Sequence, residues 1–372
     1  MKSVLFIIAL LYTGLCFGQT AESFYNSGVE ASGKNDFKGA INYFTKAISF
    51  DPQMADAYYS RGLAKSELLE SKDAISDFTK AISINPNNAS YYLNRGFENY
   101  LRQNYEDALL DFSKAKAIEP DNENVYFYSG LVKNDLGNFR EAVEDYSKAI
   151  SISPGKYQFY FNRGLVKYTL GDLNGAISDF NKSIEINPED GKAYYYRGTV
   201  KGALGDHSGS MADYDKAISF DTGNADLYYF RGVAKYGLND YTGAIEDYNK
   251  AIAINPDDAD LYFDRGIAKD DLSDYAGAIS DYSKTIELKP DNAPAYFNRG
   301  LAKDRLEDSK GAISDYTKAI SLNPRDGNIY FARGIARSSI EDMAGACADW
   351  TKAVELGSEE AKEMIKEYCG NN

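Results

Sequence analysis

Apolar residues recur at helical spacing along the chain, in a pattern that repeats every 34 residues. Within residues 225–258, apolar positions three or four apart predict a first helix, which turn-forming residues follow at 239–240. A second apolar stripe over 241–254 predicts a second helix, and Pro256 ends it because proline cannot continue a helix. The window therefore predicts one helix–turn–helix unit.

The glycine of the first helix, Gly232, has counterparts at a fixed spacing along the whole chain. The other nine glycines of this series are Gly28, Gly62, Gly96, Gly130, Gly164, Gly198, Gly266, Gly300 and Gly334. A fixed period in this range is typical of a solenoid, in which each unit buries its apolar face against its neighbours. Gly232 and Ala244 are small where the two helices are expected to cross. A glycine inside a helix costs about 0.5–1 kcal/mol relative to alanine, so ten of them indicate close helix contact.

Two series of aromatic residues accompany the glycines. The first helices carry Phe24, Tyr58, Tyr92, Tyr126, Tyr160, Tyr194, Tyr228, Tyr262, Tyr296 and Tyr330. The second helices carry Phe44, Phe78, Phe112, Tyr146, Phe180, Tyr214, Tyr248, Tyr282, Tyr316 and Trp350. A closing proline is present in eight units and is replaced by Thr222 and Ser358 in the other two. With these ten concordant copies, residues 21–360 resemble the tetratricopeptide repeat family.

This resemblance implies an all-α fold, a right-handed α-solenoid superhelix of ten helix-turn-helix units plus a C-terminal capping helix over 359–370. We expect residues 19–372 to form a single solenoid. The expected repeats are 21–54, 55–88, 89–122, 123–156, 157–190, 191–224, 225–258, 259–292, 293–326 and 327–360.

The first 18 residues have the composition of a secretory signal peptide. Lys2 gives the positive start, residues 4–15 the short apolar run, and Gly18 a small residue before the expected cut. The residues before Cys16 fit the bacterial lipoprotein pattern poorly, so a cleaved signal is favoured over lipid attachment at this cysteine. We expect a protein exported by a Gram-negative bacterium, periplasmic or secreted, with no direct membrane insertion after cleavage.

The overall charge excludes several classes of partner. The formal net charge of −15 becomes −16 when Lys2 is removed with the signal. Nucleic acids and anionic membrane surfaces are bound by clustered Lys and Arg, which this acidic chain does not offer. We therefore expect no nucleic-acid partner.

Most repeats carry three charged residues in fixed register. Arg231, Lys235 and Asp247 show the type, with Arg before the repeat glycine, Lys three residues after it and Asp fifteen after it. The first repeat has Ser27, Ala31 and Tyr43 at these positions. Because all three charges are absent together, pairing inside each repeat is favoured. A ladder of ion pairs that fixes the register of the helices is the favoured interpretation, and a charged strip that binds a ligand is the alternative.

Residues 191–224 form the least regular repeat. Its irregular residues are Gly202, Gly205, Gly209, Ser210, Thr222 and Gly223. Added glycine raises chain entropy and weakens a helix. Sequence drift is favoured here, and a hinge is the alternative.

The C-terminal segment contains the features of a solenoid cap. Residues 360–368 alternate charged and apolar residues, as a helix must that covers the last repeat and faces water. Folding back about Gly357 would bring Cys347 and Cys369 side by side. Because an exported chain meets oxidising conditions, we predict a disulfide between them, with two buried free thiols as the alternative.

No catalytic or cofactor site is indicated by the sequence. His207 is the one histidine, so a cluster of imidazole metal ligands is impossible, and the two C-terminal cysteines lack zinc-site spacing. The carboxylates follow the repeat, so no single pair suggests acid–base catalysis. Phosphate-binding and nucleophile motifs are absent from the sequence. We expect no enzyme activity, no cofactor and no metal.

What remains is a binding surface. In the tetratricopeptide repeat family, the first helices line the concave side of the superhelix and hold extended peptides or partner segments. The implied groove residues are Tyr59, Leu93, Asn94, Tyr100, Phe127, Phe161, Asn162, Tyr168, Tyr195, Tyr229, Tyr236, Phe263, Phe297 and Asn298. A packing role is the alternative for each of them.

The resemblance thus predicts a protein–protein interaction scaffold that binds a peptide or a partner-protein segment. Two other functions remain open. One is a lipid-anchored subunit of an outer-membrane complex. The other is a receptor for a small molecule or a glycan that uses the aromatic groove.

Overall fold

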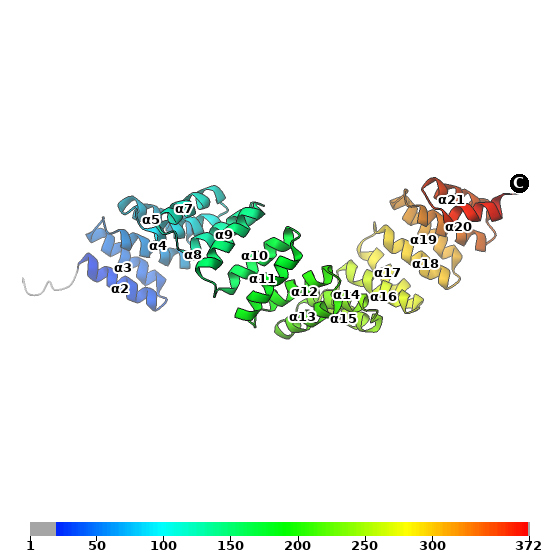
Figure 1. The fold of residues 1–372 in the computed structure, drawn as a ribbon, viewed down its shortest axis with the longest axis horizontal. Helices are drawn as coiled ribbons and strands as arrows, with labels where there is room; N and C mark the ends of the chain where they lie inside the picture. The colour runs from blue at the N-terminus through cyan, green and yellow to red at the C-terminus, as the bar shows by residue number, and fades with distance from the viewer. Residues whose placement is uncertain (1–19, 371–372) are drawn as a thin grey trace, which may run out of the picture. The chain divides into compact units, whose positions relative to one another are not determined.

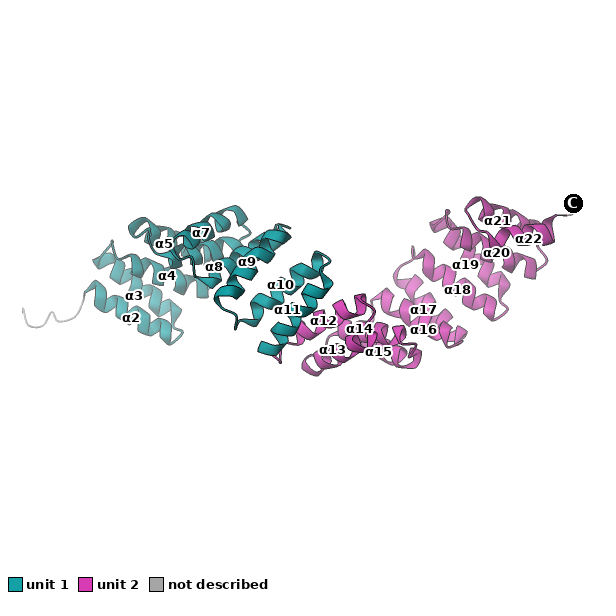
Figure 2. Ribbon diagram, in the orientation of Figure 1, with its two compact units in different colours: residues 1–186 teal, residues 187–372 magenta. Residues whose placement is uncertain are grey.

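The computed structural model describes residues 20–370, and over this range it consists of helices without strands (Figure 1). The chain divides into two compact units, residues 1–186 and 187–372 (Figure 2). The signal peptide predicted over residues 1–18 lies outside the described residues, and the single solenoid over 19–372 stays a prediction.

Each unit is a succession of helix pairs. Unit 1 contains α2 (Ala21–Gly33), α3 (Phe37–Phe50), α4 (Ala55–Glu67), α5 (Ser71–Ile84), α6 (Ala89–Leu101), α7 (Tyr105–Ile118), α8 (Glu123–Asp135), α9 (Phe139–Ile152), α10 (Tyr157–Thr169) and α11 (Leu173–Ile186). Unit 2 contains α12 (Gly191–Ala203), α13 (His207–Phe220), α14 (Ala225–Gly237), α15 (Tyr241–Ile254), α16 (Ala259–Asp271), α17 (Tyr275–Leu288), α18 (Ala293–Arg305), α19 (Ser309–Leu322), α20 (Gly327–Ser339), α21 (Met343–Glu355), α22 (Glu360–Met364) and the π-helical turn η1 (Ile365–Cys369). Within each unit, every helix packs against the next along the chain. The predicted α-solenoid fold is confirmed.

The turn inside each pair holds one residue with positive φ, and in seven of the ten pairs the aspartate after it caps the second helix. Asn239, between α14 and α15, has φ 61°, and the next residue, Asp240, caps α15 by accepting a hydrogen bond from the backbone N–H of Gly243 at 3.0 Å. A Cβ on Gly243 would lie 2.2 Å from an Asp240 carboxylate oxygen, so a larger residue here would displace the capping carboxylate.

The same turn explains two of the irregular glycines in residues 191–224. Gly205 has φ 82° at the turn position, and Gly209 donates its N–H to the capping Asp206 at 2.9 Å. The nearby Ser210 is buried and donates its hydroxyl to the Gly198 carbonyl at 2.8 Å. Gly205 and Gly209 therefore belong to the turn that the repeats share, and the choice between sequence drift and a hinge for residues 191–224 stays open.

The core of each repeat is an aromatic side chain packed on the repeat glycine. A Cβ on Gly232 would lie 2.8 Å from the ring of Tyr248, which is 2 % exposed, and 3.3 Å from the carbonyl oxygen of Ala244. The equivalent aromatic is buried in every other repeat: Phe44, Phe78, Phe112, Tyr146, Phe180, Tyr214, Tyr282, Tyr316 and Trp350. The close helix contact predicted from the glycine series is confirmed.

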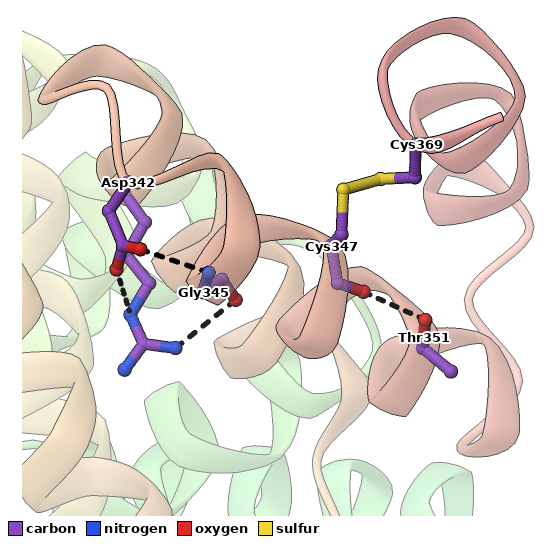
Figure 3. Close-up of a disulfide and its surroundings, with 6 residues drawn as sticks. Asp342, Gly345, Cys347, Thr351 and Cys369 are labelled. Carbon is purple, nitrogen blue, oxygen red and sulfur yellow. Dashed lines mark hydrogen bonds and ion pairs between the residues drawn. A yellow bond between two sulfur atoms is a disulfide. The ribbon is translucent and has the colours of Figure 1, made fainter. Parts of the chain in front are cut away.

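The cap packs on the last helix pair through a small apolar cluster. Ala361 of α22 is fully buried in a cluster with Trp350 and Ala353 of α21. A disulfide joins Cys347 of α21 to Cys369 of η1, with the two Cα atoms 5.8 Å apart (Figure 3). This bond fixes the end of the cap to the helix that it covers.

Glu98 places a buried carboxyl group at a position that is apolar in the flanking repeats. Glu98 of α6 is 2 % exposed and occupies the place of Ala64 and Val132 in the flanking repeats. One of its carboxylate oxygens accepts a hydrogen bond from Ser66, and the other has no partner among the described residues. Leaving a buried polar atom without a partner costs about 1–3 kcal/mol.

Replacing Glu98 with valine is therefore expected to stabilise unit 1 by about 1–2 kcal/mol, because the unpartnered oxygen is removed. The midpoint of urea unfolding should rise accordingly. Glu98→Gln is the matched control, since glutamine keeps the shape and an uncompensated polar group. A midpoint that falls with both valine and glutamine would show that the carboxylate is needed for stability.

Candidate protein-interaction surface

The charged triplet of each repeat is a buried ion-pair network. Asp247 is fully buried, and its carboxylate oxygens lie 2.5 Å from the guanidinium of Arg231 and 2.8 Å from Lys235 Nζ. Burial alone would raise the pKa of Asp247, but the hydrogen bonds from Arg231 and Lys235 outweigh it and lower the pKa below its ordinary value. Pairing inside the repeat, as predicted from the sequence, is confirmed.

The network also reaches the neighbouring repeat. The guanidinium of Arg231 donates to Asp215 of the preceding second helix at 2.6 Å, and that of Arg95 donates to Thr79 at 3.0 Å. Within the other repeats, the pairs that correspond to Arg231–Asp247 are Arg61–Asp77, Arg95–Asp111, Arg163–Asp179, Arg197–Asp213, Arg265–Asp281, Arg299–Asp315 and Arg333–Asp349. These contacts therefore fix the register between repeats as well as within them.

One repeat replaces the arginine without losing the charge balance. Ser129 stands where eight of the other nine repeats carry Arg, and it donates to Asp145 at 2.7 Å. Lys116 of the preceding repeat, at a position that is isoleucine in its neighbours, lies 3.0 Å from the same carboxylate, and Lys133 lies 2.9 Å from it. Because a substitution in one repeat is compensated from the repeat before it, the network is structural, and the alternative of a ligand-binding strip loses its support.

The first helices of the repeats, which carry the even-numbered labels from α2 to α20, form a second surface. Hydroxyl and carboxamide groups join residues 35 apart on successive first helices, such as Asn94 to Tyr59 at 2.9 Å and Tyr229 to Asp264 at 2.8 Å. Tyr100 donates to Asp135 at 3.0 Å and Tyr236 donates to Asp271 at 2.6 Å. In each unit these helices stand side by side, and we call their shared surface the first-helix face.

All fourteen predicted groove residues lie on first helices and are half-buried. In unit 1 they are Tyr59, Leu93, Asn94, Tyr100, Phe127, Phe161, Asn162 and Tyr168, and in unit 2 they are Tyr195, Tyr229, Tyr236, Phe263, Phe297 and Asn298. Seven of the aromatic rings pack within 6.1 Å, between centroids, of the second-helix aromatic of their own repeat: Tyr59, Phe127, Phe161, Tyr195, Tyr229, Phe263 and Phe297. These rings therefore form part of the packing and show only one side to solvent.

One position on the first helices, directly after Tyr59 and its equivalents, differs from one repeat to the next. The series is Asn26, Ser60, Asn94, Tyr128, Asn162, Tyr196, Phe230, Asp264, Asn298 and Ala332, and we call it the variable row. All except the exposed Asn26 are half-buried. At the buried core position the same ten repeats use only Phe, Tyr and Trp. The first-helix face therefore combines a constant framework with changing chemistry.

Unit 2 has a small cavity on this face, lined by aromatic and acidic residues. It has a volume of about 210 Å³ and is lined from α12, α14 and α16 by residues that include Tyr195, Phe230, Asp226, Asp258 and Asp260. Only Tyr195 and Tyr229 of its lining were predicted from the sequence. Phe230 and the aspartates were missed because acidic residues at helix starts are common in this chain. The available signal was the variable row itself, in which phenylalanine occurs once.

Two properties of residues 20–370 bear on possible function. In this range no three His, Cys, Asp or Glu side chains gather as metal ligands. No helix of the same range is both long and apolar enough to cross a bilayer.

Family models match most of the repeats. One, described as TPR repeat, matches residues 130–171, 234–269 and 271–306. A second, described as tetratricopeptide repeat, matches 21–54, 55–88, 157–190 and 293–326, and together the two cover more than half of the chain. The chain belongs to the tetratricopeptide repeat family. Neither description names a catalytic activity, and the repeats support a role as a protein-interaction scaffold.

Solved structures of tetratricopeptide repeat proteins are similar to this one. The C-terminal part of a TPR repeat-containing protein from Cytophaga hutchinsonii is 22% identical with a TM-score of 0.56, over 64% of this chain and 98% of that one. Pseudomonas aeruginosa PilF is 17% identical with a TM-score of 0.51, over 57% and 96%. The MamA protein is 28% identical with a TM-score of 0.44, over 45% and 92%. No curated protein matched by sequence.

Proposed function

We propose that this tetratricopeptide repeat protein is a scaffold that binds an extended segment of a partner protein along its first-helix face. The observation that carries the proposal is the variable row. If that face served packing alone, the same side chain would suit every repeat, as it does at the buried aromatic. A row whose chemistry changes at each step presents a different contact to each successive part of a bound chain.

The proposal also uses the partly exposed rings beside the row. Aromatic side chains supply large contact areas at low cost in side-chain entropy and are enriched among the residues that dominate binding energies. Their attachment to the core, as with Tyr229 on Tyr248 at 6.0 Å, holds them in place before a partner arrives. Export is a separate expectation that rests on residues 1–18 alone, and the scaffold proposal does not depend on it.

The test uses a random dodecapeptide library displayed on phage and selected on the immobilised full chain. We expect enriched peptides whose affinity falls by about tenfold or more, equivalent to about 1.4 kcal/mol, in the variants Asn94→Ala and Phe230→Ala. Isothermal titration with synthetic copies of the peptides measures this loss.

The matched controls are Lys80→Ala and Lys318→Ala, which alter exposed residues of the second helices α5 and α19. These controls should retain affinities within about twofold. Equal losses in both sets of variants, or a library that yields no enriched peptide, would refute binding at the first-helix face.

A further inference from the structure

The cavity on the first-helix face of unit 2 has walls of two kinds. Phe230 stands between two tyrosine rings, 5.8 Å from Tyr195 and 5.0 Å from Tyr229 between centroids, at interplanar angles of 61° and 62°. The remaining wall carries the carboxylates of Asp226, Asp258 and Asp260. Rings and carboxylates thus border the same small space.

The electrostatic environment of the cavity is negative. No Lys or Arg is among its lining residues, and burial followed by the nearby charge of Asp226 raises the pKa of Tyr195 to about 12. Burial, and then repulsion from Asp260 and Asp258, raises the pKa of the adjoining Asp264 despite its hydrogen bond from Tyr229. The cavity therefore disfavours any further negative charge and favours a positive one.

The carboxylates are available for a ligand. Asp226 is exposed and makes no ion pair within the described residues. Asp258 caps α16 by accepting from the Asp260 N–H at 3.0 Å, which leaves its second oxygen outside that bond. Asp260 pairs with Lys289 at 2.8 Å, but both side chains are about half exposed, and surface pairs of this kind contribute only about 0–1 kcal/mol.

The volume indicates the size of the occupant. At about 210 Å³ the cavity lies below the range of about 300–1,000 Å³ that is usual for small-molecule sites. It suits the end of one long side chain. The chain already pairs cations with tyrosine faces elsewhere, because the Arg231 guanidinium carbon lies 5.6 Å from the centroid of Tyr228.

We propose that this cavity, lined by Tyr195, Tyr229 and Phe230 and by Asp226, Asp258 and Asp260, binds a basic side chain of the partner segment. The inference rests on the proposed function, since it names the chemistry that the scaffold recognises at one place on its first-helix face. The cation is held between the ring faces and the carboxylates, and a guanidinium suits both because it is planar and carries several donors.

The test repeats the phage selection on the full chain and on a variant with Asp226→Asn and Asp258→Asn. Both changes are nearly isosteric, and asparagine retains the capping bond of residue 258. The matched control is Asp221→Asn with Asp257→Asn, which removes the same charge from exposed positions outside the cavity. We expect peptides enriched in Arg or Lys on the unchanged protein and on the control, and loss of that preference in the cavity variant.

Synthetic peptides then measure the effect at one residue. In the most enriched peptide, the selected basic residue is replaced by citrulline if it is arginine or by acetyl-lysine if it is lysine. We expect an affinity loss of about tenfold on the unchanged protein and of less than about threefold on the cavity variant.

The outcomes separate the two proposals. Enriched peptides without a basic preference, or a basic preference that survives in the cavity variant, would overturn this inference and leave the scaffold function standing. A selection that enriches no peptide would overturn both.

Discussion

Replacing Asp247 with alanine is expected to lower the free energy of unfolding of its repeat by about 3–5 kcal/mol. The carboxylate is fully buried, and its removal leaves Arg231 and Lys235 as two partly buried cations without their shared partner. Breaking a buried pair by removing one side costs this much because the remaining charge stays desolvated. Hydrogen exchange of α14 and α15 measures the loss locally, which suits a chain whose repeats can open separately.

The effect should depend on pH in a defined direction. Because the folded-state pKa of Asp247 is lowered, its contribution is complete above the ordinary pKa of about 3.8 and is lost as the pH falls through the lower folded value. The difference in stability between the unchanged protein and Asp247→Ala should therefore be constant near neutrality and shrink in acid. A difference that grows in acid would contradict the assignment.

Three further variants distinguish a needed contact from a needed charge. Arg231→Ala, alone and combined with Asp247→Ala, should give losses that are smaller together than their sum, and additive losses would count against contact. The triple variant Arg231→Leu, Lys235→Tyr and Asp247→Tyr replaces the whole charged triplet with apolar and aromatic side chains. It should recover most of the stability, since a buried ion pair can often be exchanged for packed apolar groups.

Removing the disulfide is expected to destabilise the C-terminal cap by about 3 kcal/mol. The bond between Cys347 and Cys369 closes a loop with a sequence separation of 22, and loops of this length constrain the unfolded chain by about that amount. Because solenoid repeats depend on their neighbours, α22 and η1 should open first and expose Ala361 and Trp350. Exchange of the amides of α21 and α22, before and after reduction, measures the effect.

A double variant supplies the control for the disulfide. Cys347→Ala with Cys369→Ala should exchange as fast as the reduced protein and should not respond to reductant. Titration of thiols in the denatured, unreduced protein should find neither cysteine reactive. Two reactive groups from these positions would show that the bond does not form in solution.

The repeat period determined most of what the sequence could predict. The glycine series and its buried aromatics, such as Gly232 and Tyr248, follow from helical spacing and from the steric need for a small residue at a helix crossing. The ion pair of Arg231 with Asp247 could be predicted because the corresponding Arg and Asp are both absent from the first repeat. These features repeat, so a single window contains them all.

Most of the features that were missed do not repeat. Phe230 and Asp226 line a cavity because three successive first helices converge there, and no spacing along one helix reveals that convergence. Gly205 was counted as irregular because its positive φ becomes visible only in the turn. Glu98 is buried at a position that Ala64 and Val132 occupy in the flanking repeats. A charged residue in an amphipathic helix is ordinarily expected to face water, so its burial could not be predicted from the sequence.

Lys116 compensates for the arginine that Ser129 replaces, and this has a consequence for the order of the modules. If residues 89–122 were excised, the spacing would be preserved, but Ile82 would then occupy the place from which Lys116 reaches Asp145. The carboxylate would keep only Lys133 as a charged partner. Neighbouring modules in this part of the chain are therefore matched pairs, and shuffling or shortening the array would break a dependence that its regular period conceals.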